Sequence, residues 1–448
     1  MTSTAPSAVA GPAGGTARRG LTLVAVAIVL TGLNLRTAVN SVGPVLEEIQ
    51  RGLGLSSSLA GLVTSLPVLC FAALAFAGPP LSARFRDSHV LAGAMLAMAA
   101  GLVLRSVAGS FAVFVLGTAV AMTGGALGNV LLPSIVKRYF PHRTGLLVGA
   151  YSTALSVGAA VAAVVTQPLA DAVGPGGWRW ALGVWAVLAL VAALPWLPVR
   201  PAPGASRASH TAVPLRLLLR SRLAVALTVF FGLQAMQAYV IVGWSAQYLR
   251  DTGLSAATAG LLLGINSIVA IPVNAVVPVL TVRARLQWPL LCVLMVCYAV
   301  GWLGLWTAPL AAPWLWMILL GLGLGTFSMV LSLLGLRART PVTTAALSTV
   351  TQGWGYLIAG VGPLLVGVLR GVTGGYDGMF VLMLAGVAGL WALGWLVTRD
   401  RHVDDELPPW LPGPRQGDAD ADAGDIEVAG VEPPVSPRAE RDGASPRG

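Results

Sequence analysis

Arg36 is the ionised side chain that lies well inside an apolar stretch of this sequence. The stretch begins near residue 21, so a helix that rises 1.5 Å per residue places Arg36 about 22 Å along it. A charge at such a depth in a membrane usually faces a cavity or a partner. We therefore predict that Arg36 attracts an anionic or strongly dipolar solute. The alternative is an arginine that reaches the head groups or bonds carbonyl groups at a helix break near Gly43 and Pro44.

Uncharged polar residues recur at comparable depths in other apolar stretches. Together with Arg36 they are predicted to contact the solute, while hydrogen bonding between neighbouring helices is the competing explanation for any single one. The candidates are Asn34, Asn40, Asn129, Tyr151, Gln234, Gln237, Asn266, Gln352 and Tyr356.

Acidic residues and histidines are missing from the apolar stretches. The six acids of residues 1–398 are all expected in loops, which excludes a buried carboxylate as proton carrier or cation ligand. The sequence also has no cluster of Cys, His and acids, so neither a metal site, a cofactor nor a disulfide is expected. The six acids are Glu47, Glu48, Asp87, Asp171, Asp251 and Asp377.

The composition indicates a protein with many membrane spans. The 448 residues are 56% hydrophobic and 10% charged, whereas soluble domains carry about 25% charged residues. The formal net charge is +10. Its basic residues lie between apolar stretches, which argues for contact with the lipid bilayer and against nucleic-acid binding.

Twelve stretches are long and apolar enough to span a membrane, which takes about 20 residues. They are 21–45, 57–81, 89–108, 110–132, 144–168, 180–198, 223–247, 257–281, 288–307, 314–336, 343–369 and 378–398.

The arginines predict the orientation of these spans. If the N-terminus is cytoplasmic, eighteen basic residues fall in cytoplasmic segments and five (Arg51, Arg105, Arg179, Arg250 and Arg370) on the opposite face. Basic residues concentrate on the cytoplasmic side of membrane proteins. We predict a multi-pass protein of the cytoplasmic membrane with both termini inside.

An internal repeat divides the chain. Residues 51–62 align with residues 250–261, with Arg, Gly, Leu, Ser, Ala, Gly and Leu in common. Two parallel six-helix halves are the arrangement of major facilitator transporters. We predict an all-α membrane protein of twelve transmembrane helices in two six-helix pseudo-repeats. The expected parts are a disordered N-terminus (1–19), two halves (20–198 and 223–398), a cytoplasmic linker (199–222) and a disordered acidic tail (399–448).

Several segments carry a family resemblance. They are LNLRTAVNSVGPVLEEI (33–49), GLSSSLAGLVTSLPVLCF (54–71), GNVLLPSIVKRYFP (128–141), RTGLLVGAYSTALSVGAA (143–160) and GWRWALGVWA (177–186). In these segments the chain resembles the cyanate/nitroimidazole-transporter-like family of the major facilitator superfamily. The superfamily's loop between the second and third spans is degenerate here, and the resemblance implies a gating role only for Arg84. In this architecture the first and fourth helices of each half line the cavity, which favours Asn34, Arg36, Gln234 and Gln237.

The resemblance implies secondary active transport of a small polar or anionic solute, such as a cyanate-like anion or a nitroheterocycle, by alternating access of a monomer. The alternative is efflux of a small amphipathic drug or metabolite by the same fold. A lipid-modifying enzyme is disfavoured because residues 1–398 lack aspartate-rich motifs, and an ATP-driven pump because Lys137 follows no Gly-rich loop. A passive channel is the weakest of these hypotheses.

Overall fold

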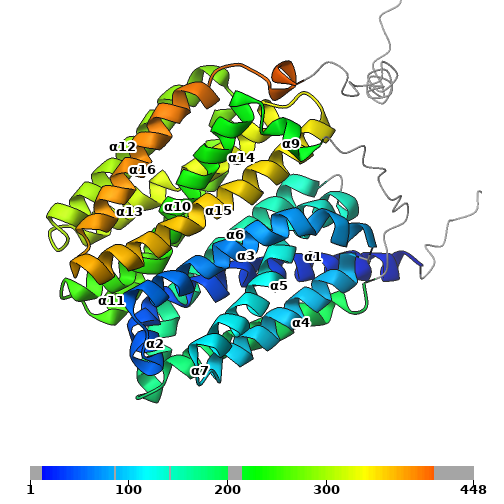
Figure 1. Cartoon of the computed structure of the whole chain (residues 1–448). Coiled ribbons are helices and arrows are strands. Elements are labelled where there is room, and N and C mark those ends of the chain that lie inside the picture. The colour runs from blue at the N-terminus through cyan, green and yellow to red at the C-terminus, as the bar shows by residue number, and fades with distance from the viewer. Residues whose placement is uncertain (1–12, 85–86, 141–142, 200–213, 408–448) are drawn as a thin grey trace, which may run out of the picture. The chain divides into compact units, whose positions relative to one another are not determined.

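The computed structural model describes residues 13–84, 87–140, 143–199 and 214–407. By internal contacts the chain divides into residues 1–407 and residues 408–448, and all described residues belong to the first unit. Regular structure in the described residues is helical (Figure 1). They contain 12 helical segments long and apolar enough to cross a membrane.

The N-terminal half comprises six membrane segments. Ser110 caps one of them by accepting a hydrogen bond from the backbone N–H of Val113, which satisfies one donor that the first helical turn leaves free. The elements are α1 (Ala13–Asn40), η1 (Gly43–Val45), α2 (Leu46–Leu53), α3 (Ser57–Arg84), α4 (Asp87–Ser106), α5 (Phe111–Tyr139), α6 (Thr144–Val173), α7 (Trp178–Gly183), α8 (Trp185–Ala193) and η3 (Leu194–Trp196).

The C-terminal half repeats this plan. Ser221, Ser255 and Thr340 cap three of its helices in the same way as Ser110. The elements are α9 (Leu215–Leu218), α10 (Arg222–Asp251), α11 (Ala256–Thr281), α12 (Ala284–Thr307), α13 (Pro313–Gly323), α14 (Gly325–Leu336), α15 (Pro341–Thr373), α16 (Asp377–Val397) and η4 (Val403–Glu406).

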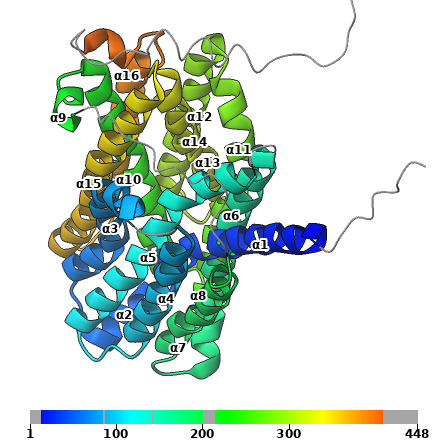
Figure 2. The ribbon, with the colours of Figure 1, turned by 90° about the vertical axis from the view of Figure 1, so that its right-hand side faces the viewer.

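Helix pairing is the same in both halves. In the N-terminal half α1 packs on α6, α4 on α5 and α8, and α3 on α5; in the C-terminal half α10 packs on α15, α12 on α13 and α16, and α11 on α13. The halves meet through two equivalent pairs, α3 with α15 and α6 with α11. Figures 1 and 2 show α3 beside α15. The prediction of twelve helices in two pseudo-repeats is confirmed.

Large apolar side chains lie on the outside of the helices. Leu116, Val279 and Val372 are 57%, 62% and 81% exposed, whereas Gln234 and Arg105 are fully buried. This is the reverse of a soluble domain and suits contact with lipid tails, because polar groups in a membrane need partners inside the protein.

Three sequence expectations need correction. The first span does not run unbroken to residue 45, because α1 ends at Asn40 and the chain continues through η1 into α2. Glu47 and Glu48 therefore lie in a helix and not in a loop, and Asp171 lies in the last turn of α6. The other three acids expected in loops are terminal residues of helices: Asp87 of α4, Asp251 of α10 and Asp377 of α16.

Two segments expected to be disordered are helical in part: α1 begins at Ala13, within the predicted N-terminal segment 1–19, and residues 399–407 of the predicted tail are described and include η4. The other tail residues, 408–448, lie outside the described residues.

Gly158 sets the approach of α6 to α1 close to Arg36. A Cβ at Gly158 would collide with the carbonyl oxygen of Leu33, while a Cβ at Gly149 of the same helix would meet open space. We expect Gly158→Ala to lower the free energy of unfolding by about 1–3 kcal/mol, the usual cost of overpacking. Thermal melting of the detergent-solubilised protein measures this effect.

Gly149→Ala is the matched control. Alanine forms helix more readily than glycine, so this variant should melt at or above the wild-type temperature. Equal melting temperatures for the two variants would show that the close approach of α6 to α1 does not contribute to stability.

Candidate functional site

Arg36 is a guanidinium without a counter-ion. It lies near the middle of the first candidate span, Gly20–Leu53, and is partly buried. Its Nε atom is buried and has no hydrogen-bond partner. Among the described residues no hydrogen bond or ion pair is found for Arg36, so it is free to bind an acceptor from a ligand.

The neighbours of Arg36 belong to the other half. Its charge acts on the hydroxyl groups of Tyr239 in α10 and Tyr356 in α15. Both tyrosines come from the C-terminal half, whereas Arg36 comes from α1. The side chain therefore lies between the halves, where a transporter with two moving halves binds its solute.

Aromatic rings surround Tyr356. The centroid of its ring lies 5.7 Å from that of Phe71, 5.0 Å from Phe231 and 6.5 Å from Tyr239. We call these four residues the aromatic group. Phe71 belongs to α3 of the N-terminal half and the other three to the C-terminal half, so the aromatic group joins the halves. Its flat apolar faces suit a small planar molecule.

Asn40 lies one helical turn beyond Arg36 on α1. Its side chain is 2% exposed, and its Nδ2 donates to Ser267 Oγ of α11 at 3.4 Å. The Oδ1 atom is buried and has no partner. Asn40 thus presents a free acceptor at the interface between the halves.

Three other candidates hold helices together within one half. The Nδ2 of Asn34 donates to the Leu30 and Leu188 carbonyl oxygens at 2.9 and 3.2 Å. Gln237 Nε2 donates to the Met383 carbonyl oxygen at 2.8 Å, and its Oε1 accepts from Trp302 Nε1 at 2.7 Å. Asn266 Nδ2 donates to the Met317 carbonyl oxygen at 3.1 Å. These bonds match the competing explanation from the sequence, hydrogen bonding between helices.

No hydrogen bond, ion pair or ring contact among the described residues joins the remaining candidates to Arg36, among them Asn129, Tyr151 and Gln352. Gln234 is fully buried, and neither atom of its amide has a hydrogen-bond partner. Tyr151 instead packs against an apolar cluster of the N-terminal half. Arg84 is the last residue of α3, and its side chain lies outside the described residues.

Arg105 is a functional candidate that the sequence misplaced. It was expected on the membrane surface, but its side chain is fully buried in α4. It donates to the Ala38 carbonyl oxygen at 3.0 Å and to Ser41 Oγ at 3.3 Å. A cation at a helix C-terminus is favourable, so Arg105 stabilises the end of α1 just beyond Arg36.

Ion pairs join the halves at the end of the molecule where α2 lies, which we call the Glu48 end. Arg250 of α10 contacts the two carboxylate oxygens of Glu48 at 2.8 and 3.0 Å. It also pairs with Glu47 at 2.8 Å and donates to the Pro44 carbonyl oxygen at 2.9 Å. Gln247 adds a bond of 2.9 Å to Gln50. The halves are therefore tied together at this end.

Backbones of the two halves also touch at the Glu48 end. A Cβ at Gly367 of α15 would lie 2.5 Å from the Ser57 carbonyl oxygen of α3. A Cβ at Gly43 would collide with the Val242 carbonyl oxygen of α10. Such close approach, together with the ion pairs of Arg250, shows that this end is closed.

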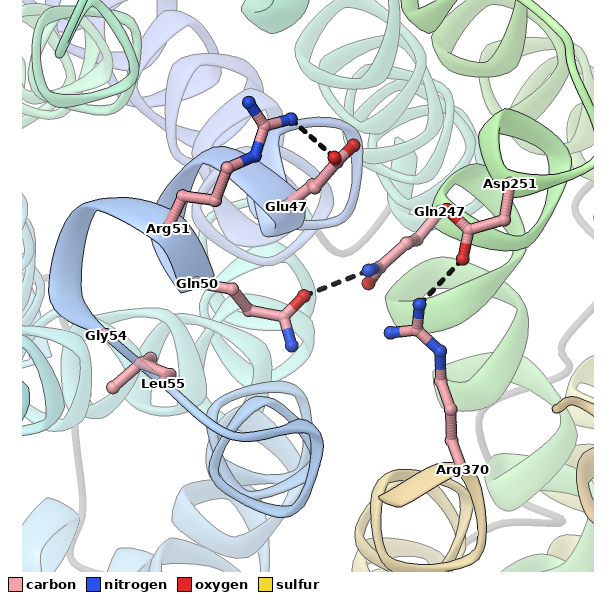
Figure 3. Close-up of a pocket in the computed structure, with 8 residues that line it drawn as sticks. All are labelled: Glu47, Gln50, Arg51, Gly54, Leu55, Gln247, Asp251 and Arg370. Atoms are coloured by element: carbon pink, nitrogen blue, oxygen red, sulfur yellow. Dashed lines mark hydrogen bonds and ion pairs between the residues drawn. The ribbon is translucent and has the colours of Figure 1, made fainter. Parts of the chain in front are cut away.

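An open pocket of about 460 Å³ lies on the surface of the Glu48 end (Figure 3). Its ionised side chains are already paired, Arg51 with Glu47 and Arg370 with Asp251 at 2.7 Å. The pocket therefore offers a ligand less free charge than Arg36 does. Its lining residues are Glu47, Gln50, Arg51, Gly54, Leu55, Gln247, Asp251 and Arg370.

Tyr376 supports this pairing from the turn between α15 and α16. Its hydroxyl donates to Asp251 at 2.7 Å. Burial raises the pKa of the Tyr376 phenol, and the hydrogen bond to Asp251 raises it further. The phenol therefore remains a donor throughout the physiological pH range.

The opposite end, which we call the Arg337 end, is built differently. Arg337 follows α14, is 3% exposed, and donates to the carbonyl oxygens of Val397 and Thr398, each at 3.0 Å. Burial lowers the pKa of Arg337, and the nearby Asp400 opposes that shift. Glu406 of η4 accepts from the N-terminus of α10, at Leu223 N, at 3.1 Å. These contacts stay within the C-terminal half and do not tie the halves together.

No group of three His, Cys, Asp or Glu side chains that could hold a metal ion is found in the described part of the chain. The chemistry available at Arg36 is therefore charge, hydrogen bonding and aromatic contact.

Known proteins resemble this chain over most of its length. The Major Facilitator Superfamily pattern matches residues 24–363. The uncharacterized transporter YycB of Bacillus subtilis (strain 168) is 35% identical over 84% of this chain and 93% of its own length. The 2-nitroimidazole transporter of Escherichia coli (strain K12) is 34% identical over 84% of this chain and 95% of its own. The cyanate transport protein CynX of the same strain is 31% identical over 78% and 90%.

Solved structures share the fold. A bacterial homologue of the human lysosomal transporter Spinster, in an inward-facing and occupied conformation, matches with a TM-score of 0.70 over 87% of this chain and 98% of its own. At 18% identity this likeness concerns the fold alone. The sequence matches and the shared twelve-helix fold agree, and the chain belongs to the major facilitator superfamily as a membrane-spanning secondary transporter and not an enzyme.

Proposed function

We propose that this transporter carries a small polar or anionic solute, of the cyanate-like anion or nitroheterocycle class, and binds it at Arg36. The observation that carries the proposal is the guanidinium of Arg36, which has no counter-ion among the described residues and lies close enough to Tyr239 and Tyr356 of the aromatic group for its charge to act on them. An arginine at the centre of a membrane helix costs about 2.5–3.5 kcal/mol on insertion scales. A bound anion would offset that cost.

The relatives support this solute class. Two of them are named for transport of 2-nitroimidazole and of cyanate, at 34% and 31% identity. Cyanate is an anion, and a nitro group presents oxygen acceptors. Both chemistries suit the five donors of a guanidinium.

Transport would follow alternating access, in which the two halves rock around a fixed site. The Arg250–Glu48 contact closes the Glu48 end in the structure described here. Opening of that end requires these ion pairs to break, while the α3–α15 and α6–α11 contacts pivot.

The orientation follows from charge. The segments that the sequence predicts to be cytoplasmic carry eighteen basic residues, and those predicted on the opposite face carry five. Arg337 belongs to the first set and Arg250 to the second, so the positive-inside rule assigns the Arg337 end to the cytoplasm. We infer that both termini are cytoplasmic and that the structure is closed toward the outside.

Efflux of a small amphipathic compound is the second candidate, favoured by the aromatic group. The rings of Phe71, Phe231 and Tyr356 present apolar area to the same interface as Arg36. In that case binding would depend on the rings and not on the charge of Arg36.

We expect Arg36→Gln to weaken binding of cyanate and of 2-nitroimidazole. Hydrogen bonds to a charged group contribute about 1.5–3 kcal/mol, which corresponds to roughly a 10- to 100-fold rise in Kd. Arg36→Lys should have a Kd between those of wild type and Arg36→Gln, because lysine keeps the positive charge but lacks the planar guanidinium with its paired N–H donors. Ligand-induced stabilisation of the purified protein in a thermal melt measures both variants.

Arg220→Gln is the matched control, since Arg220 is exposed at the Arg337 end. It should bind like wild type. Unchanged binding in Arg36→Gln would refute the anchor role. Stabilisation by neutral amphipathic compounds alone, equal in all variants, would support the amphipathic solute of the second candidate.

The ion pairs of Arg250 yield a second prediction. Glu48→Gln should raise the ratio of open to closed Glu48 end about fivefold, because losing an ion pair of about 1 kcal/mol shifts an equilibrium by that factor. The measurement is the distance between spin labels placed at Gly54 and Val372, which are exposed residues of different halves, after serine replaces the native cysteines. A longer distance should become more populated.

Arg51→Gln is the control for the ion pairs between Arg250 and α2. It breaks the Arg51–Glu47 pair, which lies within α2 and does not join the halves. Its distance distribution should match that of wild type, and a Glu48→Gln distribution identical to both would show that the ion pairs do not hold this end closed.

The orientation is tested by labelling. In a cysteine-free background, Gly54→Cys should react with a membrane-impermeant maleimide in intact cells. Arg220→Cys should react only after the membrane is permeabilised. The reverse pattern would invert the assignment of the two ends.

A further inference from the structure

Two buried polar groups without partners lie on one face of α1. They are the Nε of Arg36 and the Oδ1 of Asn40. Residues four apart on a helix are neighbours, with Cβ atoms about 5–6 Å apart. Asn40 bonds Ser267 of the C-terminal half, and Arg36 lies within electrostatic reach of Tyr239 of the same half.

The hydrogen bonds around Asn40 decide which of its atoms is free. Ser267 Oγ donates to the Leu263 carbonyl oxygen at 3.4 Å, so its lone pairs are left to accept from Asn40. The amide nitrogen of Asn40 therefore faces Ser267, and the oxygen remains unpaired. That oxygen can be satisfied only by a donor.

The two groups require opposite hydrogen-bonding partners, an acceptor for Arg36 and a donor for Asn40. A guanidinium has only donors, so Arg36 requires an acceptor on the ligand. Asn40 Oδ1 requires an N–H or O–H. Burying either group without a partner is costly, and one ligand that carries both functions would satisfy the pair.

The aromatic group limits the shape of that ligand. The charge of Arg36 acts on the hydroxyl groups of Tyr356 and Tyr239, which both belong to the aromatic group. The other three rings of that group lie with their centroids 5.0–6.5 Å from the centroid of Tyr356. Ring faces pack favourably on other flat rings. A linear triatomic anion would fill neither this aromatic surface nor the span from Arg36 to Asn40.

We propose that Asn40 determines specificity by accepting a hydrogen bond from the substrate, which is a small planar ring bearing an acceptor group for Arg36 and a donor that reaches Asn40, one helical turn further along α1. This inference rests on the proposed function, because it takes Arg36 as the anchor. It narrows the solute class to ring compounds with both functions.

Two matched ligand pairs test the role of the donor. 2-Nitroimidazole is compared with its N-methyl analogue, which lacks the ring N–H, and 3-hydroxybenzoate with benzoate, which lacks the hydroxyl. We expect wild type to bind the donor-bearing member of each pair about three- to tenfold more tightly, the worth of one neutral hydrogen bond. Kd values come from titration calorimetry of the purified full chain.

Asn40→Ala should reduce that ratio to about one in both pairs, because the acceptor is gone. Asn34→Ala is the matched control, since Asn34 is a buried asparagine of the same helix whose Oδ1 also lacks a partner among the described residues, but whose amide nitrogen bonds Leu30 and Leu188 within the N-terminal half. It should keep the wild-type ratio even if it lowers stability. The ratio compares two ligands on one protein and so does not respond to a general loss of fold.

Other results separate this inference from the proposed function. Asn40→Ala that weakens both members of a pair equally would make Asn40 structural and overturn the inference. Wild type that binds cyanate but neither ring pair would overturn it as well, while leaving the anchor role of Arg36 intact. If Arg36→Gln loses all binding while wild type prefers the donor-bearing member of each pair, the anchor role of Arg36 and the inference about Asn40 are both supported. If wild type binds none of these compounds, both are overturned.

Discussion

The interior of this protein cannot supply water to its polar groups, and this constraint governs the whole structure. In hydrocarbon each buried donor or acceptor must find a partner within the protein. Arg105 meets the demand at the end of α1, and Gln237 meets it between Trp302 and Met383. Some buried polar atoms of the described residues still lack a partner, and among them are the Nε of Arg36 and the Oδ1 of Asn40, which lie where the two halves meet. Their lack of partners points to a ligand more strongly than their polarity does.

The pseudo-repeat explains where such groups can be tolerated. Each half packs its own helices by the same pairing, and the halves meet through the equivalent pairs α3–α15 and α6–α11. Several polar groups inside a half, such as Asn34, Gln237 and Asn266, are fixed by bonds between its helices. Groups on the facing surfaces have partners that change as the halves rock, so a solute can complete them.

Charges at the molecule's ends perform a separate task. At the Glu48 end Arg250 ties α10 to α2, whereas at the Arg337 end Arg337 and Glu406 bind helices of one half. The first arrangement controls the contact between halves, and the second keeps the C-terminal half rigid. A rigid half with a breakable contact to its neighbour is what alternating access requires.

The sequence by itself determined the twelve spans, the repeat and the depth of Arg36, because apolar length and charge position are local properties of the chain. It could not separate Gln237, which bonds Trp302, from Asn40, which keeps a free oxygen. Nor could it identify Phe71 as a neighbour of Tyr356, or Glu48 as a partner of Arg250. The Phe71–Tyr356 and Glu48–Arg250 pairs join residues more than 200 positions apart, and only the packing of the two halves brings them into contact.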